Sequence, residues 1–219
     1  GSGWATGGTM GSGRVFLSGA GTATAGLAIG GLNNTGPTYR SALTEEYNGT
    51  SWSEQGDLST ARGQGVGFGI QTAGVCATGD SAPTDHETAV EEYNGSSWTS
   101  GTSNSLGRNG AGGNGTSTSG LVISGNKSPG VTITPITEEF DGSAWTTGGS
   151  VNTARYGVMA TGVQTQHCVL VESQDLDLQL QLLQKNMMVL LGQLLQQLWE
   201  LYVYRINKVV DQMYQPLLL

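Results

Sequence analysis

The hydrophobic and polar positions of this chain follow two patterns, which meet at about residue 165. In residues 1–165, short apolar runs alternate with small polar residues and end at glycine or at Asn-Gly pairs, which is typical of short β-strands joined by tight turns. In residues 166–219, leucine and methionine recur at spacings of three and four, as at Leu183, Met187 and Leu190. The first pattern predicts an all-β region, and the second fits an amphipathic helix.

The all-β region is a repeat. The octapeptides EEYNGTSW, EEYNGSSW and EEFDGSAW occupy residues 45–52, 91–98 and 138–145. Successive tryptophans lie 48, 46 and 47 residues apart, an arginine follows each by ten residues, and a glycine follows the first three arginines by seventeen. All the length variation falls between that glycine and the next Glu pair. The repeated positions are Trp4, Arg14, Gly30, Gly31, Tyr47, Trp52, Arg62, Gly79, Tyr93, Trp98, Arg108, Gly125, Phe140, Trp145 and Arg155.

Each repeat predicts four short strands. A small-residue strand near 65–68 and a strand ending in glycine at 74–79 precede the Glu-pair strand, and Asn-Gly then leads into the strand that carries the Trp. The Asn-Gly pairs indicate two-residue type I′ turns, which need positive φ at both central residues. One such unit cannot bury both of its faces, so stacking around an axis must supply the core. The pattern therefore predicts the blades of a β-propeller.

The repeat resembles the kelch repeat of galactose-oxidase-type central propellers. The resemblance rests on the aromatic residue, the Trp shortly after it, the Arg ten residues on, and a strand ending in the pair Gly30-Gly31. In the amino-acid sequence of their motifs, residues 1–165 are most similar to kelch-like repeats of uncharacterised structural or tail-fibre-like proteins of tailed bacteriophages. Two departures are the pairs Thr78-Gly79 and Ser124-Gly125 in place of Gly-Gly, and a Tyr-to-Trp spacing one residue shorter than is usual for kelch.

The expected fold is thus an all-β, kelch-like propeller fragment of about three to four blades. The Trp-to-Trp units are 4–51, 52–97 and 98–144, with a partial unit at 145–165. The resemblance implies about six or seven blades in a whole propeller, and the start in mid-repeat without Met agrees with truncation. Further blades of a longer chain, or another copy of this chain, are therefore expected partners.

Residues 166–219 allow two interpretations. Leucines and methionines from Leu183 to Leu201 fit a helix of a bundle or coiled coil. Alternatively, the tail is the next blade in a shifted reading frame: codons for QKNMMVLLGQ at 184–193, read two bases later, can encode EEYDGTSWT, which is the repeat itself. The restored Trp would stand 47 residues after Trp145, where the repeat requires it. This spacing favours a frameshift near codon 166.

Composition and charge reduce the number of functional classes to which this chain could belong. The chain has 219 residues, a net charge of −8 and nine Lys+Arg, which disfavours binding to a nucleic-acid backbone. No apolar run approaches the length of a membrane span. Two cysteines, Cys76 and Cys168, are too few for a disulfide framework, and Cys76 is expected to be a small buried hydrophobic residue in a strand.

Little in the repeat indicates catalysis. The Glu pairs recur in every blade, so we expect them to be solvated on the blade surface, and the arginines to tie neighbouring blades together. The Trp and Tyr positions are expected to pack within blades, with their N–H and O–H groups finding local partners. We find no nucleophile–base arrangement, P-loop, zinc pattern or counterpart of the galactose oxidase copper ligands. The sequence disfavours an enzyme and predicts no catalytic residues, metal or cofactor.

The candidate ligand-binding residues lie in the variable segments 32–44, 80–90 and 126–137. Corresponding loops of a propeller emerge on one face, and variable loops on a rigid scaffold commonly bind ligands. The candidates are Tyr39, Arg40, Asp85, His86 and Lys127.

The leading hypothesis is a non-catalytic binding module on a virion or another extracellular surface, recognising a glycan or protein. The alternatives are a structural spacer or decoration protein without a specific ligand, and a fragment of a propeller enzyme whose catalytic residues lie elsewhere.

Overall fold

The computed structural model describes residues 6–33, 39–83, 86–127 and 132–171, all within one compact unit, Gly1–Gln174. For residues 166–171 only the backbone is considered. The helix expected between Leu183 and Leu201, and the blade expected from a shifted frame beyond residue 171, lie outside the described residues.

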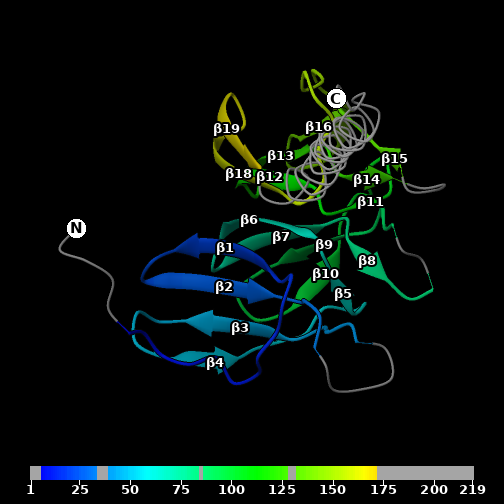
Figure 1. The fold of residues 1–219 in the computed structure, drawn as a ribbon. Coiled ribbons are helices and arrows are strands. Elements are labelled where there is room, and N and C mark those ends of the chain that lie inside the picture. The colour runs from blue at the N-terminus through cyan, green and yellow to red at the C-terminus, as the bar shows by residue number, and fades with distance from the viewer. Residues whose placement is uncertain (1–5, 34–38, 84–85, 128–131, 172–219) are drawn as a thin grey trace, which may run out of the picture. The chain divides into compact units, whose positions relative to one another are not determined.

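Three antiparallel four-stranded sheets follow one another along the chain, and a hairpin comes after them (Figure 1). Every strand pairs with the next of its sheet in sequence order. The all-β prediction is therefore confirmed. The bounds of the first sheet are β1 Ser18–Thr22, β2 Ala25–Ile29, β3 Thr44–Tyr47 and β4 Trp52–Glu54; of the second, β6 Val66–Ile70, β7 Ala73–Ala77, β9 Val90–Tyr93 and β10 Trp98–Ser100; of the third, β12 Gly112–Thr116, β13 Ser119–Ile123, β16 Thr137–Phe140 and β17 Trp145–Thr147; and of the hairpin, β18 Val158–Val163 and β19 Gln166–Val171.

Short strands lie at the end of the sheets from which the variable segments emerge. β5 (Arg62–Gly63) pairs with β8 (Asp80–Ser81). In the next repeat, β14 (Asn126–Lys127) pairs with β11 (Arg108–Asn109) on one side and with β15 (Thr132–Ile133) on the other. The variable segments therefore begin in a fixed hydrogen-bonded register with the residues at the repeated arginines, as at Arg62 and Arg108.

The Asn-Gly turns differ from the expected type I′ geometry. The aromatic residue pairs directly with the tryptophan, as Tyr47 does with Trp52, which leaves a four-residue loop at 48–51. Only Gly49 of this loop has positive φ, at 93°. The side-chain Oδ1 of Asn48 accepts hydrogen bonds from the backbone N–H groups of Thr50 and Ser51, at 3.0 and 2.9 Å. The asparagine thus closes the loop with its side chain, which a two-residue turn would not require.

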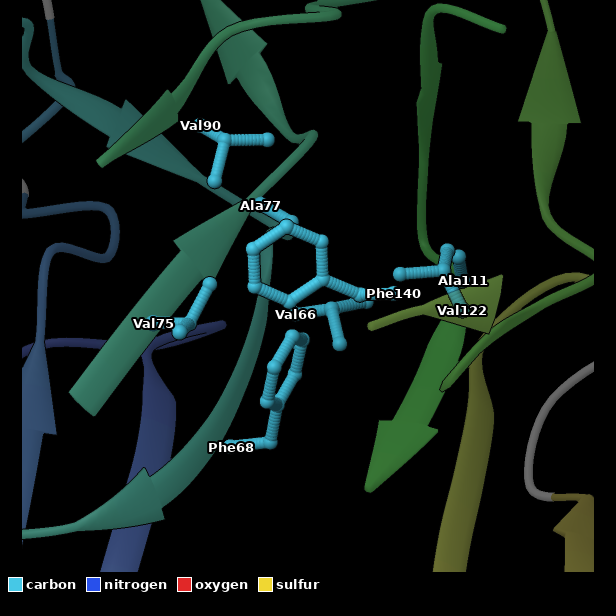
Figure 2. Packing of buried hydrophobic residues seen from close by; sticks show 8 residues of the cluster. All are labelled: Val66, Phe68, Val75, Ala77, Val90, Ala111, Val122 and Phe140. Atoms are coloured by element: carbon cyan, nitrogen blue, oxygen red, sulfur yellow. The ribbon is translucent and has the colours of Figure 1, made fainter. Parts of the chain in front are cut away.

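Hydrophobic side chains are buried where one sheet packs on the next. One cluster contains Leu27 and Ile29 of the first sheet together with Cys76, Tyr93 and Trp98 of the second. The cluster between the second and third sheets contains Val66, Phe68, Val75, Ala77, Val90, Ala111, Val122 and Phe140 (Figure 2). The second sheet thus provides a wall of both cores, which is how stacked repeats bury faces that a single repeat leaves exposed.

The aromatic pairs connect neighbouring sheets. The ring of Phe140 stacks on Trp145 with 4.8 Å between centroids, and Phe68 of the preceding sheet contacts both rings. The indole Nε1–H of Trp98 donates to Thr44 Oγ1 of the first sheet at 2.8 Å, and the Tyr93 hydroxyl donates to Glu46 at 3.0 Å. The N–H and O–H groups of Trp98 and Tyr93 therefore donate hydrogen bonds to the preceding sheet.

The first glutamate of each pair is buried, which corrects the expectation that the Glu pairs are solvated. Glu45, Glu91 and Glu138 are 3%, 2% and 1% exposed, and each pairs with the arginine that precedes its own sheet. The second carboxylate oxygen accepts a backbone N–H from the connecting segment, as Ser59 N–H donates to Glu91 Oε2 at 2.7 Å. A buried carboxylate requires such pairing. At Glu45 the ion pair is looser, because Oε1 lies 3.2 Å from Arg14 Nη2 and makes no hydrogen bond to the described residues. Each ion pair therefore fixes the connecting segment to the sheet that follows it.

The arginines also differ from the expected arrangement. The side chain of Arg62 stays within its own repeat, where it donates to the carbonyls of Thr78 and Ala89 at 3.2 and 2.8 Å. Its backbone carbonyl makes the contact to the preceding repeat by accepting from Gly31 N–H at 2.9 Å. The same bond recurs from Gly79 to Arg108 and from Gly125 to Arg155.

A second set of backbone bonds joins the residues two positions after each arginine. Gln64 N–H donates to Phe16 O at 2.9 Å, Gly110 N–H to Gln64 O at 3.0 Å, and Gly157 N–H to Gly110 O at 2.8 Å. All four residues have φ between 52° and 66°. This ladder fixes the register of the first strands, β1, β6, β12 and β18, which contact one another in turn.

Candidate functional site

The variable segments emerge from the same end of each sheet. Each joins the second strand to the third: β2 to β3, β7 to β9, and β13 to β16. Because the sheets stack in register, these segments form one surface, which we call the loop face and define as the described residues of 32–44, 80–90 and 126–137. The first-strand hairpin turns and the Asn-Gly loops lie at the opposite end of the sheets.

An ion pair crosses the loop face between two repeats. Arg40, from the first variable segment, donates from Nε and Nη2 to Asp80 Oδ1 at 3.0 and 2.5 Å. The two side chains are 20% and 16% exposed, so the pair is largely shielded from water. Backbone pairing holds both residues: Arg40 forms a bridge with Leu32, and Asp80 pairs with Gly63. Arg40 was predicted to bind ligand, and the structure places it in this fixed pair beside Asp80.

A second polar contact lies next to this pair. The hydroxyl of Tyr156 hydrogen-bonds Gln64 Oε1, although 92 residues separate them. The Tyr156 ring lies over Gly110, where any side chain would collide with it. Partial burial raises the pKa of the Tyr156 hydroxyl, the charge of Asp80 raises it further, and the bond to Gln64 opposes the shift. Two polar pairs between repeats, Arg40–Asp80 and Gln64–Tyr156, therefore lie near this end of the sheets, and the charge of Asp80 acts on Tyr156.

Sequence reasoning missed Gln64 and Tyr156. The available signal was that both break the repeat pattern. The position of Gln64 is glycine in the two following repeats, and Tyr156 stands where the other repeats carry Val15, Gly63 and Asn109. Only the stacking of the repeats shows that these two exceptions touch.

The remaining candidate ligand-binding residues, Tyr39, Asp85, His86 and Lys127, are not all placed beside Arg40. Tyr39 adjoins Arg40, with φ of 55° and 62% exposure, so its ring is available to a ligand. Lys127 lies in β14, paired with Arg108 on one side and Thr132 on the other. His86 has a buried Nε2 that makes no hydrogen bond to the described residues. Asp85 lies outside the described residues.

The chemistry offered by the loop face is recognition by hydrogen bonds, one aromatic surface and a fixed ion pair. Within the described ranges, no three side chains of His, Cys, Asp or Glu gather as a metal site would require. The repeat carboxylates Glu45, Glu91 and Glu138 are occupied by their arginines. Across the part of the chain that the structure describes, there is also no helix of the length and hydrophobicity needed to cross a membrane.

Comparison with solved structures identifies the fold. In all, 127 chains resemble this one, among them that of "Structure of YjhT", with a TM-score of 0.56 and 15% sequence identity over 67% of this chain. The fold is a β-propeller. The match covers 56% of the YjhT chain, so this chain spans about half the length of that structure. No family model and no curated protein matches the sequence.

Proposed function

We propose that this chain is a non-catalytic binding module of kelch-like type, carried on a phage particle or another extracellular surface, which recognises a glycan or protein through its loop face. The observation that carries the proposal is two polar contacts between repeats, Arg40–Asp80 and Gln64–Tyr156, near the end of the sheets from which the variable segments emerge. Arg40 and Asp80 belong to the loop face, and Gln64 follows Gly63, which pairs with Asp80. Such convergence on a rigid scaffold is typical of binding surfaces.

The scaffold supports this role because the buried arginines contact the variable segments through backbone atoms. Arg62 and Arg108 pair with Glu91 and Glu138, and they also donate to the backbone carbonyls of Ala89 and Ile136 in the variable segments. Side chains of the variable segments can therefore change while these contacts persist. An exposed tyrosine next to a fixed cation, as at Tyr39 and Arg40, is also a combination enriched at recognition surfaces.

Binding can be tested by applying the purified chain to an array of immobilised glycans and to candidate host-surface proteins. The binding module predicts a saturable signal that falls about tenfold or more in Tyr39→Ala and Tyr156→Phe, since a lost contact of about 1.4 kcal/mol is tenfold in affinity. Tyr156→Phe removes only the hydroxyl, so its fold should be preserved.

Thr118→Ala is the matched control, because Thr118 is exposed in the β12–β13 turn at the opposite end of the sheets. Its binding should equal that of the unaltered chain. A chain that binds no array member, or whose binding ignores both tyrosine variants, would instead be a spacer or decoration protein.

A further inference from the structure

The chain contains four Asn-Gly dipeptides, and the fold gives them two kinds of surroundings. They begin at Asn48, Asn94, Asn109 and Asn114. Asn48 and Asn94 are exposed, in equivalent loops that join the third strand of a sheet to the fourth. Asn109 and Asn114 are each 8% exposed and lie in strands β11 and β12. An asparagine followed by glycine is prone to deamidation, because glycine has no Cβ to hinder the approach of its nitrogen to the asparagine side chain.

Deamidation of such a pair is an attack within the chain followed by hydrolysis. The glycine backbone nitrogen loses its proton and bonds to the asparagine Cγ, the bond from Cγ to Nδ2 breaks, and Nδ2 leaves as ammonia. Solvent water then opens the resulting succinimide ring. If water breaks the new bond between the nitrogen and Cγ, aspartate forms and the original main chain is restored; if it breaks the bond to the α-carbonyl carbon, isoaspartate forms. The reaction requires an available glycine N–H, donors that stabilise the negative charge developing on Oδ1, and access for water.

The loop at Asn48 meets these three requirements. Asn48 Oδ1 accepts from the backbone N–H groups of Thr50 and Ser51 at 3.0 and 2.9 Å, and their hydroxyls lie 2.8 and 3.4 Å from the same oxygen. Neither the Gly49 N–H nor the Asn48 Nδ2 donates to an acceptor among the described residues. Donors therefore surround the oxygen on which charge develops, while the attacking nitrogen and the leaving group remain available.

The loop at Asn94 has the same arrangement. Asn94 Oδ1 accepts from the backbone N–H groups of Ser96 and Ser97, both at 3.0 Å, and the two hydroxyls lie 3.0 and 3.4 Å away. The φ of Gly95 is 94°, against 93° for Gly49, and its N–H likewise has no acceptor in the part of the chain that the structure describes. We therefore expect the two loops to react alike.

The other two Asn-Gly pairs lack at least one requirement. The Gly110 N–H donates to Gln64 O at 3.0 Å, so the nitrogen that would attack Asn109 is occupied. Gly115 is held opposite Gly120 in the β12–β13 ladder. The buried Oδ1 of Asn114 accepts no hydrogen bond from the described residues, so no donor is in place to stabilise charge on it. The same dipeptide is thus protected at these two positions.

The third repeat shows that the loop accommodates the product. Asp141 stands at the position of Asn48 and Asn94, and its Oδ1 accepts from the N–H groups of Ala144 and Ser143 and from the Ser143 hydroxyl, all at 2.8 Å. These bonds, with that of Ala144 first, lower the pKa of Asp141. Aspartate formed in either of the other loops would keep the corresponding bonds, whereas isoaspartate would lengthen the main chain of the loop and displace the acceptor.

We propose that Asn48 and Asn94 are deamidation sites, which the fold leaves open to conversion into aspartate while it protects Asn109 and Asn114. Each conversion adds one negative charge to a chain whose net charge is −8. Both sites lie at the end of the sheets opposite the loop face, so the inference goes beyond the proposed binding function and does not depend on it.

The experiment incubates the purified 219-residue chain at mildly alkaline pH in water enriched in heavy oxygen, with and without urea. Peptides that contain each of the four sites are then analysed by mass spectrometry, because the oxygen taken from water marks a converted site. In the folded chain, we expect Asn48 and Asn94 to convert about tenfold or more faster than Asn109 and Asn114. In urea the four rates should become similar, since only the dipeptide then decides the rate.

Asn48→Asp is the matched variant. It should melt at the temperature of the unaltered chain, because the loop of Asp141 already carries this residue, and it should leave the rate at Asn94 unchanged. The aspartate share of the converted product should also be larger in the folded chain than in urea. Similar rates at all four sites of the folded chain would overturn the proposal. The same holds if Asn48 and Asn94 do not convert in a period that suffices in urea.

Discussion

The guanidinium of Arg62 and the carboxylate of Glu91 form an ion pair with 2.8 Å between Nη2 and Oε1, and their side chains are only 1% and 2% exposed. Removing one partner leaves an unpaired buried charge, which typically costs 3–5 kcal/mol. Glu91→Gln and Arg62→Met should therefore each lower the free energy of unfolding by about 3 kcal/mol or more, measured by urea denaturation.

The control for this prediction is the more exposed pair of Arg40 and Asp80. Asp80→Asn should cost about 1 kcal/mol, because water screens part of that interaction. The double variant Arg62→Met, Glu91→Leu should cost less than the sum of its single changes, since it buries no lone charge. Equal losses for Glu91→Gln and Asp80→Asn would contradict a special role of the buried pair.

Thr78 stands where the first repeat has Gly30, in a left-handed conformation. Its φ is 61°, and its buried hydroxyl makes no hydrogen bond to the described residues. Left-handed φ is unfavourable for a β-branched residue, and an unpaired buried hydroxyl is costly. We expect Thr78→Gly to raise the free energy of unfolding by about 1 kcal/mol, measured by chemical denaturation.

Ser124 occupies the equivalent position with the opposite outcome. Its φ is 58°, but its hydroxyl oxygen accepts the Arg155 N–H at 2.7 Å and lies 2.7 and 2.8 Å from the carbonyl oxygens of Thr134 and Arg155, one of which takes its single proton. Ser124→Gly should therefore lower stability by about 1 kcal/mol. If both glycine variants shift stability in the same direction, the hydroxyl contacts do not decide the effect.

Cys76 makes stability sensitive to alkaline pH. Burial raises the pKa of its thiol from 9.0 to about 11, and burial followed by the hydrogen bond to Glu46 raises the pKa of Tyr93 as well. The folded state therefore keeps protons that the unfolded state releases. This contribution is complete below pH 9 and is lost as pH rises toward 11, at a cost of about 2 to 3 kcal/mol for Cys76.

The measurement is the urea midpoint between pH 7 and pH 11. In Cys76→Ala, which has no thiol at this position, the midpoint should fall less steeply with pH, while Tyr93 maintains part of the slope. Identical slopes for the variant and the unaltered chain would show that the thiol titrates normally when folded.

The spacing from Arg155 to the next expected glutamate indicates whether the tail is written in the original reading frame. In the three complete repeats, the buried glutamate follows its arginine by 31, 29 and 30 residues. The corresponding positions after Arg155 are Gln184, Lys185 and Asn186, and none is a carboxylate. Codons for these residues, read in the shifted frame, can encode Glu at this place. We propose that one base was lost near codon 166.

Sequencing the encoding nucleic acid and its flanks tests this proposal. We expect a single-base slip near codon 166 and, in the restored frame, a Glu pair about 30 residues after Arg155. An intact frame with no plausible site for a slip would contradict it and would leave the amphipathic helix as the interpretation of the tail.

Much of the fold could be predicted from the repeat because each strand is local. The Glu-pair strand, the Trp strand and the hairpin between them follow from residues within one short segment, such as 45–52. The turn type was wrong because the Asn48 side chain, and not a second positive φ, closes the loop. The solvation expected for Glu91 was wrong because its burial depends on Arg62 and on the segment at Ser59, 29 and 32 residues away.

The candidate site was less predictable for the same reason. Arg40 was a candidate because it lies in a segment whose length varies between repeats, but its partner Asp80 lies in another repeat. Tyr156 and Gln64 meet across a whole intervening repeat, at a glycine that leaves room for the ring. Pattern reasoning treats repeats one at a time, so it cannot see contacts that exist only after stacking.

The sequence by itself determined the repeat length, the four strands of each unit and the face from which variable segments emerge, because alternation, turn residues and spacing act within one unit. The tertiary structure decided which glutamate is buried and which residues of different repeats touch, such as Arg40 with Asp80 and Gln64 with Tyr156. These depend on packing one sheet against another. Burial and charge pairing are set by the neighbouring sheet, which a single repeat does not contain.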